Sequence, residues 1–128
     1  NMKVEVSNGE LLDKLTILEI KIKNITDTNK LVNIYNEFNE LNPLAKQLFE
    51  NNEGQLQNHY THLKEINSEL WKIEDDIREC ERNKDFGEKF IELARAVYIT
   101  NDKRCEVKKL INILTGSELV EEKGYEEY

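Results

Sequence analysis

Apolar residues recur every three or four positions along most of this chain, which is the spacing of one face of an α-helix. The regularity holds over several turns at a time, as in helices that pack lengthwise against one another. The pattern predicts four helices, whose buried faces are Leu11, Leu15, Leu18, Ile22 and Ile25; Leu31, Ile34, Phe38, Leu41, Ala45 and Leu48; Leu56, His59, Leu63, Ile66, Leu70, Ile73, Ile77 and Cys80; and Phe90, Leu93, Val97, Thr100, Arg104, Val107, Ile111 and Leu114.

Polar residues that begin helices stand in the breaks between these runs. Ser7 and Glu10 have the spacing of a capping box, which predicts the start of the first helix. Asp85, with Glu88 three residues later, predicts a similar cap for the fourth helix. Pro43 lies inside the second run, but the apolar phase passes through it undisturbed. We therefore expect one kinked helix there rather than two.

Short connections between successive helices favour antiparallel neighbours. We predict an all-α protein in which two antiparallel helical hairpins form an elongated four-helix bundle. The hairpins are expected at 8–51 and 55–115, and an acidic C-terminal tail follows at 116–128. With 128 residues, the chain has the size of a single helical domain, 1–128.

The two ends of the chain alternate between apolar and polar residues, as strands do. "KVEV" at 3–6 and "SELVE" at 117–121 are both short. A two-stranded ribbon of this length is marginal unless it packs on the helices. A short ribbon formed by the termini is therefore an additional hypothesis about the fold.

The charge of the chain excludes several classes of partner. The net charge is −8 and the pI about 4.9, so we expect no nucleic acid partner and no anionic membrane surface. No apolar run approaches the length of a membrane span, and the first residues do not form a signal peptide. Cys80 and Cys105 are far apart and form no CxxC motif. Two free thiols and a cytoplasmic location are the expectation.

Some apolar residues lie outside the four helix faces. Several of them should complete the core, and the remainder should mark a surface for self-association. We therefore predict a homodimer, with a further protein partner as an additional hypothesis. These residues are Leu12, Ile17, Ile20, Phe49, Ile99, Leu110 and Ile113.

Two patterns that suggest a metal site do not define one. His59 and His62 are three residues apart, but two ligands without further ones do not make a zinc site. Carboxylates also occur four residues apart, a spacing that helical Mg²⁺ enzymes use in denser sets. A solvated, ion-paired face is the simpler interpretation of these pairs, so we expect no metal and no cofactor. The pairs are Asp75 with Glu79 and Asp102 with Glu106.

The fourth helix turns polar at Thr100 and Arg104, in the middle of its apolar face. In an antiparallel register, Arg104 lies opposite Ile66, near Glu65 and Glu69. A buried polar residue in such a face can set the register of the helices. Alternatively, two guanidinium groups and a Tyr hydroxyl could bind a phosphate, a carboxylate or a partner side chain. The candidate ligand- or partner-binding residues are Arg95, Tyr98, Asn101, Asp102, Arg104 and Glu69.

Four motifs in order carry a resemblance over nearly the whole chain: "NGELLDKLTILEIK", "LWKIEDDIR", "FIELARAVYITNDKR" and "GSELVEEKGY". The chain resembles a family of small uncharacterised bacterial and phage proteins, a domain of unknown function. The resemblance implies no activity and no catalytic residue. The leading hypothesis is a non-catalytic helical interaction or assembly module. The alternative is a small helical hydrolase or anion-binding protein that uses the Arg95–Arg104 cluster.

Overall fold

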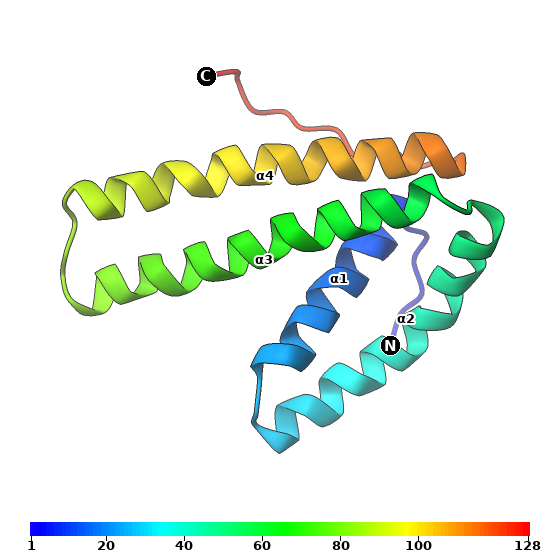
Figure 1. The fold of residues 1–128 in the computed structure, drawn as a ribbon, viewed down its shortest axis with the longest axis horizontal. Helices are drawn as coiled ribbons and strands as arrows, with labels where there is room; N and C mark the ends of the chain where they lie inside the picture. Colours follow the sequence, from blue (N-terminus) through cyan, green and yellow to red (C-terminus); the bar gives the residue numbers. More distant parts are fainter.

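The computed structural model describes residues 1–128 as four α-helices without a strand (Figure 1). The helices are α1 (Asn8–Asn24), α2 (Thr28–Asn51), α3 (Gln55–Arg82) and α4 (Glu88–Thr115). The all-helical fold class is therefore confirmed. None of the four helices is both long and apolar enough to cross a membrane.

Of the two N-terminal caps predicted from the sequence, the structure confirms one and contradicts the other. The Ser7 hydroxyl accepts a hydrogen bond from the Glu10 amide at 3.1 Å, which confirms the first cap. The prediction that Asp85 caps α4 is wrong, because the residue before α4 is Gly87. The Asp85 amide instead bonds to the Cys80 carbonyl at 2.9 Å and so closes the end of α3. In α2, Pro43 lies within one continuous helix.

Helix α1 is the element that holds the others together. It packs against α2, α3 and α4, whereas α2 packs chiefly on α1. Helices α3 and α4 lie side by side, and their connected ends extend past α1 and α2 (Figure 1). Because α1 lies between α2 on one side and α3 and α4 on the other, residues on more than one of its faces are buried.

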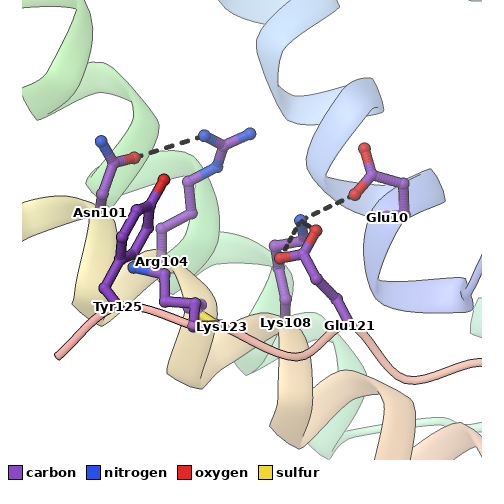
Figure 2. A pocket seen from close by; sticks show the side chains of 8 residues that line it. Glu10, Asn101, Arg104, Lys108, Glu121, Lys123 and Tyr125 are labelled. Carbon is purple, nitrogen blue, oxygen red and sulfur yellow. Dashed lines mark hydrogen bonds and ion pairs between the residues drawn. The ribbon is translucent and has the colours of Figure 1, made fainter.

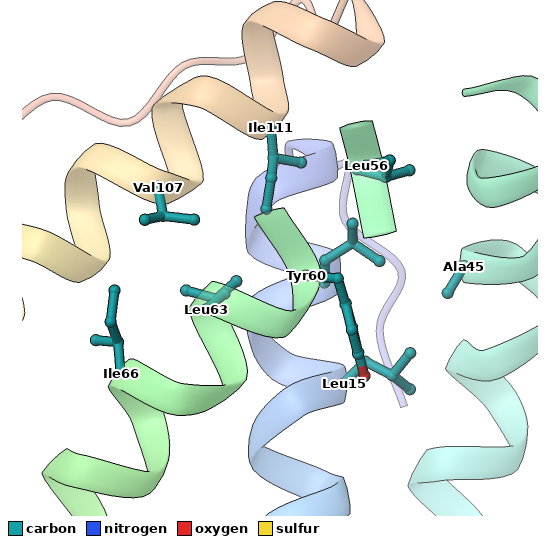
Figure 3. Close-up of a cluster of buried hydrophobic side chains, with 9 residues drawn as sticks. Leu15, Ala45, Leu56, Tyr60, Leu63, Ile66, Val107 and Ile111 are labelled. Carbon is teal, nitrogen blue, oxygen red and sulfur yellow. The ribbon is translucent and has the colours of Figure 1, made fainter. Parts of the chain in front are cut away.

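The hydrophobic core lies where α1, α3, α4 and the second half of α2 meet (Figure 3). Leu12, Leu56, Leu63 and Ile111 are fully buried within it. The Phe49 ring meets the Tyr60 ring edge-on, with 5.3 Å between the centroids. The complete cluster is Leu12, Leu15, Ala45, Leu56, Tyr60, Leu63, Ile66, Val107 and Ile111.

The ribbon predicted from the two ends of the chain does not form, because neither end is a strand. After Gly116, which has the left-handed conformation expected of a helix cap, the chain reverses direction. The C-terminal tail (116–128) then runs back beside α4 in an extended form (Figure 1). Side-chain contacts with α4, rather than a backbone ladder, hold it there: Glu121 bonds to Lys108, and Lys123 bonds to Asp102.

Candidate functional site

The polar residue in the middle of α4, Arg104, pairs with Asp13 of α1. Its Nε donates to Asp13 Oδ1 at 2.9 Å, and its Nη2 donates to Oδ2. Asp13 is 1% exposed, while 29% of the Arg104 side chain remains accessible. The hydrogen bonds to Asp13 raise the pKa of Arg104 above its ordinary value. The expected neighbours Glu65 and Glu69 are exposed and do not contact Arg104, because α1 occupies this side of α4.

Two further buried residues complete the pairing. Asn67 of α3 donates to Asp13 Oδ1 at 2.8 Å and to the Thr16 hydroxyl at 2.7 Å. The Thr16 hydroxyl in turn donates to the Asp13 carbonyl at 2.7 Å. We call Asp13, Thr16, Asn67 and Arg104 the Asp13 cluster. It joins α1, α3 and α4, and the structure contains no buried side-chain polar atom without a partner. Buried polar groups paired in this way specify one arrangement of helices.

A glycine allows α1 to approach α4 closely enough for this pairing. A Cβ added at Gly9 would lie 2.6 Å from the Lys108 carbonyl oxygen and 2.9 Å from Asn112 Oδ1. The Gly9 amide donates to that same Asn112 oxygen at 2.6 Å. Gly9, Asp13, Thr16 and Ile20 follow one another at four, three and four positions. They form a second buried face of α1, made of small and polar residues with Ile20 at its end, which lies against α3 and α4.

Lys108, one turn after Arg104, is a second cation at the contact of α1 with α4. Its side chain is 8% exposed, and its ammonium donates to Glu10 of α1 at 2.8 Å. The ammonium also lies 3.9 Å from Asp13 and 3.4 Å from either oxygen of Glu121. Burial alone lowers the pKa of Lys108. The hydrogen bond that Lys108 donates to Glu10 and the charges of Asp13, Glu10 and Glu121 outweigh burial, so the pKa is raised.

A polar pocket of about 290 Å³ lies beside these two cations (Figure 2). Its walls come from α4, from Glu10 of α1 and from the tail. Glu10 and Glu121 both point to the Lys108 ammonium in this view. The pocket is lined by Glu10, Asn101, Arg104, Cys105, Lys108, Glu121, Lys123 and Tyr125.

The candidate residues predicted from the fourth helix divide into two groups. Asn101 lies with Arg104 and accepts a long hydrogen bond from Nη1 at 3.4 Å. Asp102 and Tyr98 face the tail instead. Asp102 accepts from Lys123 and from the Tyr128 hydroxyl, both at 2.6 Å. These two hydrogen bonds lower the pKa of the Asp102 carboxyl.

Tyr98 packs edge-on against Tyr128, with 5.2 Å between the ring centroids. Arg95 is exposed and does not line the pocket beside Arg104, and Glu69 is exposed on α3. The structure therefore does not bring the two arginines together. No three His, Cys, Asp or Glu side chains meet in a group suited to a metal ion.

The sequence pattern missed the acidic partners of Arg104 and Lys108, which are Glu10, Asp13 and Glu121. It also missed Asn67, which bonds to Asp13. Asp13 has one recognisable signal, since it follows Gly9 at a helical spacing on a face made of small and polar residues. That face does not appear in a search for apolar residues. Asn67 and Glu121 carry no comparable signal, because their positions depend on how α3 and the tail meet the other elements.

The structure thus defines an all-helical protein built around a buried polar contact between α1, α3 and α4. The chain belongs to a family of unknown function, DUF6165, whose family model matches residues 2–128. Membership indicates neither a catalytic activity nor any other specific function. No curated protein and no solved structure matches the chain.

Proposed function

We propose that the protein is a non-catalytic helical interaction module, two antiparallel hairpins (α1–α2 and α3–α4), that assembles as a homodimer. The observation that carries this proposal is the use of the central charges inside the fold. Both oxygens of Asp13 accept hydrogen bonds from Arg104, and Asn67 adds a third. Groups paired in this way stabilise the arrangement of the helices. Binding of a partner would then use residues on the surface of the protein.

The same contacts argue against a small helical hydrolase, the alternative function. A general base needs an oxygen able to take a proton from water. Asp13 is buried beneath Arg104 and does not line the pocket, and the guanidinium of Arg104 engages both of its oxygens. Protonating it would break its pair with Arg104, so we assign Asp13 a structural role.

The surface of α4 near its C-terminal end supports the homodimer. Of the apolar residues outside the helix faces, Leu12 and Ile20 are buried in the fold. Leu110 and Ile113 remain 47% and 77% exposed. They are three residues apart on α4 and therefore neighbours on its surface. A two-fold contact would bring the same pair from both copies together and would bury apolar surface that one copy leaves in water.

The homodimer is tested by light scattering and sedimentation over a range of protein concentrations. We expect a dimer for the unaltered protein and a monomer for Ile113→Glu, because a charge in the contact would be desolvated. Val32→Glu is the matched control, since Val32 is 55% exposed on α2, away from the proposed contact. A monomer at every concentration, or equal behaviour of the two variants, would refute the proposed contact.

A cytoplasmic location is part of the proposal. Cys80 is buried and Cys105 is partly exposed, and both are free thiols. Free thiols are typical of proteins in a reducing compartment. Mass spectrometry of the protein from its natural source, after alkylation without reductant, tests this point. Modification of both thiols after unfolding is the expected result, and an intramolecular or intermolecular disulfide would contradict it.

A further inference from the structure

We propose that the pocket between α4, Glu10 and the C-terminal tail binds a phosphate-type dianion, and that Glu121 of the tail competes with this ligand for Lys108. The inference goes beyond the proposed dimer and does not depend on it. The pocket contains the side chains of three cations, Arg104, Lys108 and Lys123, contributed by α4 and by the tail. An anion inside it would meet a positive group from α4 and another from the tail.

The arginine keeps donors available for a ligand. A guanidinium has five N–H groups. Two of those on Arg104 go to Asp13, and a third makes the long bond to Asn101 at 3.4 Å. The other two have no partner within the chain, and the side chain is 29% exposed where it lines the pocket. Asp13 thus holds the guanidinium in place without using all of its donors.

The Lys108 ammonium makes a short contact with Glu10 and longer contacts with Glu121. Its bond to Glu10, at 2.8 Å, is an ordinary charge-assisted contact. Both contacts with Glu121 are 3.4 Å long, beyond the usual range of N–H···O bonds. Glu121 is also 51% exposed, and its backbone belongs to no helix. An exposed ion pair of this kind contributes little to stability. The Glu121 carboxylate is therefore the group that a ligand would displace.

The available donors favour a dianion over a single carboxylate. When Glu121 leaves, Glu10 is the one acidic group that remains in the lining, while Arg104 stays paired with Asp13 and Lys123 with Asp102, both outside the lining. A monoanion would only replace one carboxylate by another, and the tethered Glu121 has the advantage of a high effective concentration. A phosphate brings a second charge, and its additional oxygens can accept from Arg104 and Lys123 at the same time.

The experiment is a titration with inorganic phosphate at constant ionic strength, followed by amide NMR so that the affected residues are located. The unaltered protein, Glu121→Gln and Glu122→Gln are compared. Glu122 is the matched control, because it has the same charge and contacts Lys109, at 3.5 Å, outside this pocket. We expect Glu121→Gln to bind phosphate about fivefold more tightly than the unaltered protein, the equivalent of losing one competing ion pair.

Two further arms make the result specific. Lys123→Gln changes a partly exposed residue of the tail and should weaken the binding of phosphate to the Glu121→Gln protein by a similar factor. Acetate should bind more weakly than phosphate. Three results would overturn the proposal: no binding of phosphate to Glu121→Gln, an equal gain in Glu122→Gln, or acetate binding as tight as phosphate. The dimer is measured separately by light scattering. A failure of the phosphate proposal can therefore be told apart from a failure of the dimer proposal.

Discussion

Replacing Asp13 by Asn is the most direct test of the contact between α1 and α4. The side chain keeps its size but loses the charge that Arg104 and Asn67 share. Removing one member of a buried ion pair costs about 3–5 kcal/mol. Since 29% of the Arg104 side chain stays in contact with water, we expect the lower end, about 3 kcal/mol. For a chain of 128 residues this corresponds to a fall in Tm of about 10 °C.

Urea unfolding measures the effect, with the fluorescence of Trp71 as a local probe and circular dichroism as a global one. Trp71 is the single tryptophan, and it lines a cleft of about 460 Å³ with Ile17 and Ile20 of α1. It therefore reports on the contact of α1 with α3. Coincident transitions from the two probes would allow the free energy of unfolding to be compared between variants.

A second variant separates the ion pair from the packing around it. Changing Asp13 to Leu together with Arg104 to Met removes both charges and leaves no unpaired one. Apolar replacements of buried pairs are often neutral, so we expect the double variant to lose less stability than Asp13→Asn. A loss below about 1 kcal/mol for Asp13→Asn, the range of a surface ion pair, would refute the structural role assigned to Asp13.

Three other changes test the same contact and the tail. Gly9→Ala should cost about 1–3 kcal/mol in chemical unfolding, because the added Cβ meets the Lys108 carbonyl at 2.6 Å, while Gly124→Ala, in open space, should cost nothing. Asp102 has a lowered pKa, so its hold on the tail should be complete above pH 3.8 and should be lost as the pH falls further, with the NMR chemical shifts of Lys123 and Tyr128 as the readout. Lys108 has a raised pKa, so the stability difference between the unaltered protein and Lys108→Met should stay constant up to pH 10.5 and shrink above it; a decline that starts near neutral pH would contradict this assignment.

The sequence alone predicted which residues form helices and many of the positions that face inward, although Leu12 and Tyr60 of the core lie outside the predicted faces. The 3-4 spacing of residues such as Leu63 and Ile111 is a local property, because a helix places every third or fourth side chain on one face. Ser7 was recognised as a cap for the same reason, since its partner is the amide only three residues away. The Asp85 cap was wrong because its backbone continues the end of α3, which side-chain spacing does not record.

The partners of the charged residues were decided by the tertiary structure. Asp13 and Arg104 are separated by 91 residues, and Arg104 had equally plausible acidic neighbours on α3. Only the packing of α1 across α3 and α4, at the close approach that Gly9 permits, excludes Glu65 and Glu69. The course of the tail is a similar case, because its contacts are single side-chain pairs without a repeating pattern. The periodic burial of side chains is a property of the sequence of one helix. The pairing of charged side chains depends on which helices pack together.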